Sequence, residues 1–347
     1  MPRAWVFRPH GSDLFLSLAD SLFPAEETTI GETFVFLQFT KIKRFIIAGL
    51  LLGSALVLVV SCSPKPESSQ ATVEVGSRQI TDEAGRTVSV PAKIDRFVSL
   101  APNLTEIVYA IDAGDRLVGN TTYCDYPEQA KNVQKVGDTL QPNIERILAL
   151  RPQLILISTS SQLEAFTKQL QDRQIPVFVT NPHDLEGVFR SIENLGRLLD
   201  RSAQAEQLVS TLRNRSTAVE HAVKDRKPVR LFYQLSAEPL YTAGRDAFVT
   251  DLIRRAGGVS VTADVPEAWP RYSEESAMAA HAEAIILPTG GSMGDANTDV
   301  AAGLKKSPAV LNGKVFKING DFLVRPGPRA VDGLEAIARA LHPEAFK

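Results

Sequence analysis

Few side chains in this sequence have the types and spacing needed for metal or redox chemistry. The chain holds two cysteines, Cys62 and Cys124, which are too few for a disulfide framework or a zinc-thiolate cluster. Four histidines after residue 70 are widely separated and lack the spacing of metal ligands: His183, His221, His281 and His342. We therefore expect no bound metal, and we expect Cys124 to be a small buried apolar residue.

Motifs for covalent catalysis are also missing from the sequence. It contains no nucleophile elbow and no HExxH pair. The glycine-rich stretch TGGSMGD at 289 lacks the lysine that follows in a phosphate-binding loop, and it is typical of a surface loop. With a formal net charge of -2, the chain has no general attraction for nucleic acid. The missing motifs leave an extracytoplasmic hydrolase as only a distant alternative.

Residues 41–61 have the order of a secretory signal peptide. The basic stretch KIKR at 41 precedes an apolar run over 45–60, which is short for a membrane span of about 20 residues. The sequence VVSC ending at Cys62 resembles a bacterial lipobox, in which the cysteine becomes the lipidated first residue. We expect the mature protein to be anchored in a lipid bilayer through Cys62, in the periplasm or at the cell surface. An uncleaved anchor helix is the alternative.

The segments on either side of this signal are expected to lie outside any folded domain. Residues 1–40 do not fit a signal peptide, which starts close to its basic region, and we interpret them as an extension upstream of the real start codon. Residues 62–77 are polar and rich in proline and serine, which predicts a flexible tether.

Two blocks of alternating strands and helices follow. Residues 78–92 predict a β-hairpin, and short apolar strands are expected at 96–100, 154–157, 176–179, 229–233, 284–287 and 315–318. Helices between these strands indicate βαβ units. We expect Asn103 and Asn143 to be the N-caps of two of the helices, with Glu106 at the third helical position after Asn103.

Residues 202–225 lie between the two blocks and contain no glycine or proline, which predicts a helix about 33 Å long. The sequence thus predicts an α/β protein with two Rossmann-like lobes, residues 78–201 and 226–347, joined by a single long backbone helix.

Six segments, in this order, resemble the periplasmic binding proteins of ABC importers for cobalamin, ferric siderophores and haem. They are RFVSLAPNLTEIVYAIDAGDRLVG at 96, TYCDYPEQA at 122, VGDTLQPNIERILALRPQLIL at 136, PLYTAGRDAFVTDLIRRAGG at 239, AWPRYSEES at 268 and GDFLVRPGPR at 320. The resemblance covers residues 78–345. It implies two α/β lobes joined by a rigid helix, a small-molecule ligand between them, and an ABC permease and ATPase complex as partner. It also implies a monomer without catalysis or a resident cofactor.

Within this family, the cobalamin-binding members are the most similar. The match implies ligand contacts at Tyr123, Tyr241, Trp269, Asp321, Phe322 and Arg325, with the last three on a cleft loop. Aromatic rings suit a large, flat macrocycle, and the charged pair would orient its peripheral amides or carboxylates. The stretch STSSQLEA at 158 has no aromatic residue where cobalamin-binding members carry a tryptophan. A ferric siderophore or haem is therefore the alternative ligand.

The resemblance also implies two contacts with the permease. The family docks through one exposed glutamate on each lobe, and the matching residues are Glu145 and Glu275. Such charges steer the encounter of two proteins and fix their orientation. The alternative is that each is an ordinary glutamate at a helix start, where the helix dipole favours a negative charge. Arg329 is expected to be structural or to form the rim of the cleft.

Overall fold

The computed structural model describes residues 76–159, 164–291 and 299–347. All described residues belong to one compact unit, Thr72–Lys347. The expected signal peptide, the lipidation residue Cys62 and nearly all of the tether lie outside the described residues. No helix within the described residues is long and apolar enough to cross a membrane.

The N-terminal lobe is built on a parallel sheet. Among the described residues its strand order is β4-β3-β5-β6, with β3 at Phe97–Ser99, β4 at Leu117–Asn120, β5 at Leu154–Ser158 and β6 at Val177–Thr180. Every residue of β5 and β6 is buried, which agrees with the apolar runs LILI and VFV that begin these strands. The hairpin expected at 78–92 is formed by β1 (Ser77–Thr81) and β2 (Thr87–Pro91). The helices are α1 (Pro102–Ala110), α2 (Ile144–Ala149), α3 (Glu164–Gln171) and α4 (Leu185–Leu198).

The C-terminal lobe contains a second, mixed sheet. Its order is β11-β10-β7-β8, and β9 also pairs with β7 within the described residues. The strands are β7 (Val229–Ala237), β8 (Leu240–Thr242), β9 (Gly258–Ser260), β10 (Ala284–Thr289) and β11 (Val315–Asn319). Only the β7–β8 pair is antiparallel among these strands. The helices are α6 (Phe248–Arg255), α7 (Glu274–Ala279), α8 (Pro308–Leu311), α9 (Gly320–Val324) and α10 (Ala330–Leu341).

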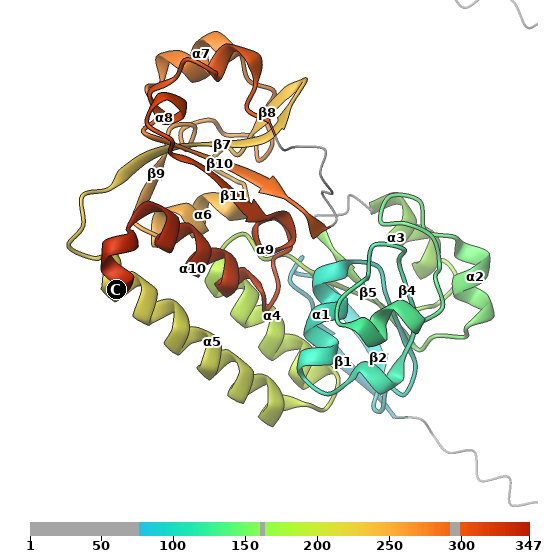
Figure 1. The fold of residues 1–347 in the computed structure, drawn as a ribbon. Helices are drawn as coiled ribbons and strands as arrows, with labels where there is room; N and C mark the ends of the chain where they lie inside the picture. Colours follow the sequence, from blue (N-terminus) through green and yellow to red (C-terminus); the bar gives the residue numbers. More distant parts are fainter. Residues whose placement is uncertain (1–75, 160–163, 292–298) are drawn as a thin grey trace, which may run out of the picture. The chain divides into compact units, whose positions relative to one another are not determined.

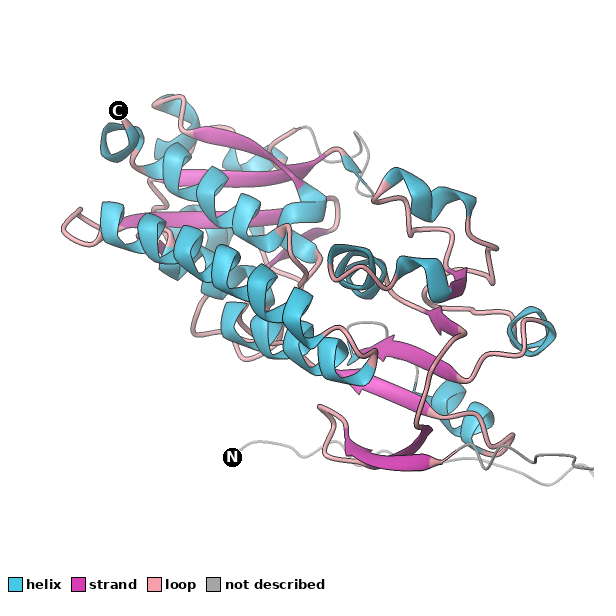
Figure 2. Cartoon of the chain, turned by 90° about the horizontal axis from the view of Figure 1, so that it is seen from below, coloured by secondary structure: helices cyan, strands magenta, loops and turns pink. Residues whose placement is uncertain are grey.

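The long helix α5 (Ser202–Val223) connects the two lobes. It packs against α4 of the N-terminal lobe and α10 of the C-terminal lobe, as Figure 1 shows. Its buried residues recur every three or four positions: Ala205, Val209, Leu212, Ser216, Val219 and Val223. This spacing keeps one apolar stripe on the inner side over the whole length of the helix. In Figure 2 the two sheets (magenta) form separate groups, and the long helix runs past both.

Charged side chains on α5 also reach both lobes. Arg213 lies 2.6 Å from Glu186 of α4, on the N-terminal side. Two residues later, Arg215 pairs with α10 of the C-terminal lobe, at 2.6 Å from Asp332 and 2.9 Å from Glu335. These partly exposed pairs add little stability individually.

One hydrophobic core runs through both lobes. A single cluster of buried side chains includes Phe97 and Phe189 from the N-terminal lobe, Leu212 from α5, and Tyr233 and Leu334 from the C-terminal lobe. Two smaller clusters each lie within one lobe. The expected α/β fold with two lobes and one connecting helix is thus confirmed, and the shared core makes the lobes a single packed unit.

Two local predictions were wrong. Asn103 does not cap α1, because Ala101 is the N-cap and Pro102 already occupies the first turn. The Asn103 amide instead donates to the carbonyl of Pro326, at 3.2 Å, in the other lobe. The second error concerns Asp321 and Phe322, which lie in the short helix α9 rather than on a loop.

A substitution in α5 tests whether the shared core makes the lobes unfold together. Leu212→Ala removes a buried side chain that contributes to the continuous core, so we expect a loss of about 2–5 kcal/mol in the free energy of unfolding. The transition followed by Trp269 fluorescence and that followed by far-UV circular dichroism should shift together in urea. Asn214→Ala, at an exposed position of the same helix, is the control. Separate transitions for the two probes would contradict a shared core.

Candidate functional site

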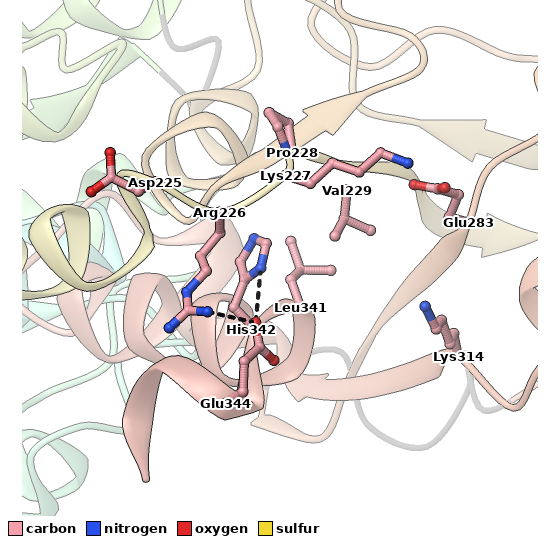
Figure 3. Close-up of a pocket in the computed structure, with 10 residues that line it drawn as sticks. All are labelled: Asp225, Arg226, Lys227, Pro228, Val229, Glu283, Lys314, Leu341, His342 and Glu344. Atoms are coloured by element: carbon pink, nitrogen blue, oxygen red, sulfur yellow. Dashed lines mark ion pairs between the residues drawn. The ribbon is translucent and has the colours of Figure 1, made fainter.

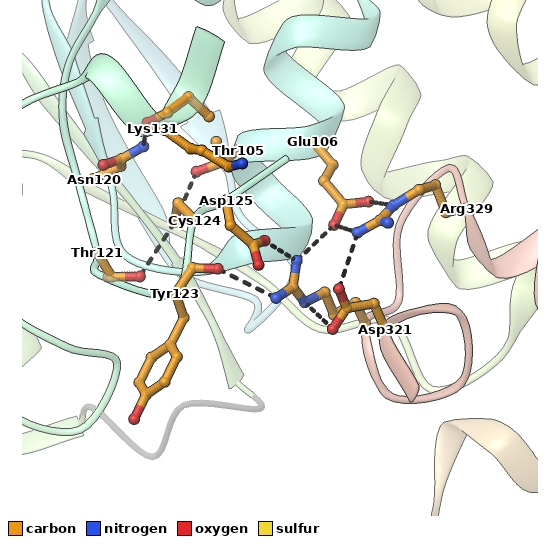
Figure 4. A network of polar contacts seen from close by, with 12 residues as sticks. Thr105, Glu106, Asn120, Thr121, Tyr123, Cys124, Asp125, Lys131, Asp321 and Arg329 are labelled. Atoms are coloured by element: carbon orange, nitrogen blue, oxygen red, sulfur yellow. Dashed lines mark hydrogen bonds and ion pairs between the residues drawn. The ribbon is translucent and has the colours of Figure 1, made fainter. Parts of the chain in front are cut away.

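Polar and aromatic side chains gather beyond the carboxyl ends of the parallel strands. Tyr123 follows β4, Gly291 follows β10 and Asp321 follows β11. In open α/β sheets, ligands bind outside this edge because loops from neighbouring strands meet there. Figure 4 shows that residues from both lobes come together in this region.

Arg325, at the C-terminal end of α9, is the centre of an ion-pair cluster between the lobes. Its Nη1 lies 2.9 Å from Oδ1 of Asp125 and 3.2 Å from Oε1 of Glu106, both in the N-terminal lobe. Its Nε lies 3.2 Å from Oδ1 of Asp321, and its Nη2 donates to the carbonyl of Tyr123 at 3.2 Å. Every nitrogen of this guanidinium therefore has a partner.

Arg329 completes the cluster from the start of α10. It binds both oxygens of Glu106, with Nη2 to Oε1 at 2.6 Å and Nε to Oε2 at 2.9 Å. Its guanidinium also lies 4.1 Å from the ring centre of Tyr126 and 5.4 Å from that of Phe322. The cation is thus held by a bidentate carboxylate and by aromatic rings from both lobes. We call Glu106, Asp125, Asp321, Arg325 and Arg329 the interlobe cluster.

Three members of the interlobe cluster are deeply buried. Glu106, Asp321 and Arg325 expose 3%, 4% and 5% of their surface. Burial of a charge is unfavourable, and here opposite charges in contact compensate for it. Removing one partner of a buried pair typically costs about 3–5 kcal/mol, because the other charge is left without compensation. The cluster therefore constrains how the lobes can separate.

Two members of the cluster have shifted pKa values. Burial disfavours ionisation of Asp125, but the hydrogen bond and charge of Arg325 outweigh it and hold the pKa of this carboxyl below its usual value. Burial likewise disfavours the charged form of Arg329, but its hydrogen bonds to Glu106 raise the pKa of the guanidinium. Both shifts favour the charged form of the group concerned.

The loop after β4 presents two tyrosines to solvent. Tyr123 and Tyr126 are 48% and 47% exposed, and Figure 4 shows the Tyr123 ring pointing away from the interlobe cluster. Between them, Cys124 is buried beside the hydroxyls of Thr105 and Thr121, as expected for a small apolar residue. Lys135 also holds this loop in place.

Lys135 ties the loop after β4 to its own lobe. Its Nζ donates to Oδ1 of Asn120 at 2.8 Å and to the carbonyls of Cys124 and Ala130, each at 3.0 Å. None of these acceptors is charged, and burial lowers the pKa of the lysine. These hydrogen bonds therefore hold the backbone around Tyr123 against the N-terminal lobe.

A second aromatic group lies in the C-terminal lobe. Trp269 is 37% exposed, and its ring centre lies 6.2 Å from that of Tyr233, which is fully buried in β7. Partly buried Tyr241 is in β8 and pairs through its backbone with Arg271, two residues after Trp269. Burial raises the pKa of Tyr233, whose hydroxyl has no partner among the described residues.

The structure thus brings together four of the six predicted ligand residues: Tyr123, Asp321, Phe322 and Arg325. No hydrogen bond, ion pair or ring contact within the described residues joins them to Tyr241 and Trp269. The sequence analysis missed Glu106 and Tyr126 as members of the site, and it left Arg329 without a specific partner. Glu106 lies off the apolar stripe of α1, so its burial against the other lobe has no signal in the sequence. Tyr126 could have been found from its place in the TYCDYP motif.

Two concavities in the part of the chain that the structure describes lie away from these residues. The first, of about 470 Å³, is at the amino ends of β7, β10 and β11, and Figure 3 shows charged side chains lining it, including Arg226, Lys314 and Glu344. The second, of about 340 Å³, lies between β1 and α4 and is lined by Arg78 and Arg197. In that second concavity, Arg78 donates to carbonyls at the end of α4, which gives it a structural role. The position of the strand ends, rather than concavity size, therefore identifies the candidate site.

Gly291 is a further member of the site. Its φ is +57°, and a Cβ at this position would lie 2.5–2.7 Å from the carboxylate of Asp321. The backbone after β10 therefore touches the acidic side chain directly, and only glycine leaves room for this approach.

The two predicted docking glutamates occupy equivalent places in the two lobes. Glu145 is the second residue of α2, which Asn143 caps as predicted by accepting from the amide of Arg146 at 2.9 Å. Glu275 is the second residue of α7, capped in the same way by Ser273. Both glutamates are exposed, and neither forms an ion pair within the described residues.

The similarity between the surroundings of Glu145 and those of Glu275 extends past the ends of α2 and α7. Arg151 and His281, each seven residues after the first helical residue, both have a φ of 48°, and a buried strand follows each: β5 in one lobe and β10 in the other. The surroundings of the two glutamates are thus repeated.

Comparison with known proteins gives consistent matches. A family model described as periplasmic binding protein matches residues 97–321. An uncharacterized ABC transporter substrate-binding lipoprotein of Bacillus subtilis is 30% identical over 88% of this chain and 99% of its own length. The crystal structure of the vitamin B12 binding protein of Vibrio cholerae is 28% identical with a TM-score of 0.66, covering 73% of this chain and 98% of that one. A haem binding protein of Pseudomonas aeruginosa is 26% identical with a TM-score of 0.64, covering 72% and 93%.

A pair of adjacent glycines tests the contact with Asp321. Gly291→Ala combines backbone strain with a collision against the carboxylate, whereas Gly290→Ala, at a φ of +68° with open space around it, has the strain alone. We expect Gly290→Ala to lower the free energy of unfolding by about 1–2 kcal/mol and Gly291→Ala to lower it further. Urea unfolding of both variants measures the difference. Equal losses would show that the Gly291 backbone does not constrain Asp321.

Proposed function

The chain belongs to the periplasmic binding protein family, and from that premise we propose that it captures a corrinoid of the cobalamin type between its lobes. As a member of this family, the protein is the substrate-binding component of an ABC importer. It works outside the cytoplasm, delivers a small ligand to a permease, and is not an enzyme. The identity of the ligand, the residues that bind it and the lipid anchor are our proposals.

The charge balance of the interlobe cluster carries the choice of ligand. Both of its guanidiniums are paired with carboxylates, and the cluster holds three carboxylates against two guanidiniums. Haem carries propionates and many ferric siderophores are acidic, so each would need an uncompensated cation in the site. A corrin ring is instead surrounded mainly by neutral amides, which need donors and acceptors but no excess positive charge.

Exposed aromatic rings support the same ligand. Tyr123, Tyr126 and Trp269 keep a third to a half of their surface in solvent, although aromatic side chains are usually more buried. Such rings offer large contact areas that lose little conformational entropy when a flat macrocycle covers them. We propose Tyr123, Tyr241, Trp269 and Phe322 as contacts, and we add Tyr126.

The charged residues have a different part in this proposal. Arg325 and Asp321 are buried in ion pairs, so we propose that they orient the ligand only through the groups they leave accessible at the edge of the cluster. Asp125 is the partner with the most exposed side chain, at 42%. It is therefore the partner that a ligand amide can displace from Arg325 most readily.

A ferric siderophore or haem remains the second candidate ligand. The observation that favours it is the absence of an aromatic residue in STSSQLEA, the stretch that begins at the end of β5. An acidic ligand would then have to replace Asp125 on Arg325.

We further propose that Glu145 and Glu275 dock the protein on its permease. Their equivalent positions in α2 and α7 give each lobe one exposed negative charge in the same local setting. A permease with one arginine for each glutamate would bind both lobes at once. Docking would then depend on how the two lobes are arranged.

We also propose that lipidated Cys62 anchors the protein in a membrane. The lipobox supports this assignment, as does the similarity over most of the chain to a lipoprotein of Bacillus subtilis.

Direct titration tests the ligand. Cyanocobalamin should bind more tightly than haemin or a ferric hydroxamate in calorimetry, because the site offers aromatic area without a free cation. Trp269→Ala should weaken cobalamin binding by about 2 kcal/mol, or roughly thirtyfold. Phe346→Ala, which removes a partly buried ring stacked on Arg339 at the C-terminus, is the control. Tighter binding of haemin or of the ferric hydroxamate would refute the corrinoid proposal.

Transport tests the docking residues separately. Glu145→Gln combined with Glu275→Gln should abolish uptake by cells while leaving ligand affinity unchanged, because neither residue lies at the strand ends that carry the site. Two other exposed glutamates, Glu206 and Glu238, are replaced by glutamine in the control. Uptake is measured with radiolabelled ligand. Normal uptake by the Glu145/Glu275 variant would eliminate the docking proposal.

A further inference from the structure

The chain passes between the lobes once within the described residues, through α5, yet the lobes touch at two separate junctions. The first junction lies beside α5, where Asp251 of α6 accepts from the amide of Leu185 in α4 at 3.0 Å. The second is the interlobe cluster, which joins α1 to the segment between α9 and α10. If the lobes were joined by a single helix alone, they could rotate about it. Contacts at two separate junctions instead restrict the angle between the lobes.

The second junction is closely packed as well as charged. The Asn103 amide donates to the carbonyl of Pro326, and a Cβ on Gly327 would lie 3.4–3.5 Å from Asn103. Tyr126 of the N-terminal lobe stacks on Arg329 of the C-terminal lobe. Backbone, amide, ring and ion-pair contacts therefore coincide in one place, as expected for a fixed contact rather than a sliding one.

Glu106 is the residue on which this junction depends. The ion pairs of Asp321 with Arg325 and Arg329 lie within one lobe, so these pairs do not join the lobes. Asp125 is in the other lobe but is partly exposed, and among the described residues it forms an ion pair with Arg325 only. Glu106 is the buried carboxylate of the cluster that crosses between the lobes, and it binds both guanidiniums.

We infer that Glu106 is a positioning residue that fixes the angle between the lobes and thereby the spacing of α2 and α7. In this arrangement α5 sets how far apart the lobes are, and the interlobe cluster sets how they are turned. The inference rests on the proposed function in one respect: the spacing of α2 and α7 matters to transport only if Glu145 and Glu275 dock on the permease.

Distance measurement between spin labels tests the inference without ligand or permease. Ala149 of α2 and Ala279 of α7 are exposed and equivalent, and cysteines at these sites can carry the labels. The full chain is used with Cys62→Ser, and Cys124 is 1% exposed and shielded from the reagent. Double electron–electron resonance should give one narrow distance distribution for this background and a broader, shifted one for Glu106→Gln.

Glu83→Gln is the matched control. Glu83 is also a partly enclosed carboxylate with several partners, but it binds the amide of Asn181 and the side chains of Ser191 and Asn194 within its own lobe. The Glu83→Gln substitution should therefore leave the distance distribution unchanged. If Glu83→Gln broadens the distribution as much as Glu106→Gln does, the effect is general loosening and the inference fails.

A second variant guards against misfolding of Glu106→Gln. Glu106→Gln combined with Arg329→Gln removes one charge of each sign, so that the net charge of the cluster is unchanged and no guanidinium loses all its partners. A broadened distribution in this folded variant supports the inference, and an unchanged one overturns it. Uptake is read separately: if the distances change but uptake does not, the docking proposal fails while the role of Glu106 stands.

Discussion

The structure depends on the burial of one continuous apolar stripe of α5 against both lobes. Buried residues of this helix, such as Val209 and Leu212, belong to the same cluster as side chains from each sheet. Because protein interiors are close-packed, neither lobe can move away from α5 without opening a cavity. The lobes therefore behave as parts of one core, and the site between them is held largely preformed.

The interlobe cluster adds a different kind of constraint. Hydrophobic contact is non-directional and tolerates rotation, whereas the bidentate pairing of Arg329 with Glu106 has one favourable geometry. Buried ion pairs contribute little net stability compared with apolar side chains of the same size, but separating one leaves an uncompensated buried charge, which is strongly destabilising. Here such pairs lie where the relative orientation of the two lobes decides the shape of the site.

The same cluster bears on selectivity. An unpaired arginine at this position could bind an anionic ligand. The nitrogens of Arg325, however, already have partners in both lobes. The site is left with exposed rings and a surplus of carboxylate over guanidinium. A neutral macrocycle fits that chemistry better than an acidic one. In our proposals, the orientation of the lobes and the choice of ligand both follow from this one set of ion pairs.

The sequence by itself determined the elements, because hydrophobic periodicity, caps and glycine positions act locally. The apolar runs of β5 and β6, the cap at Asn143 and the uninterrupted α5 were predicted from neighbours along the chain. Resemblance added candidate site residues, four of which the structure brings together. Only the tertiary structure decided what Glu106, Asn103 and Gly291 do, since their partners are in the other lobe or on another strand end. Contacts between residues about 220 positions apart leave no periodic trace in the sequence, because packing of the lobes, rather than local propensity, creates them.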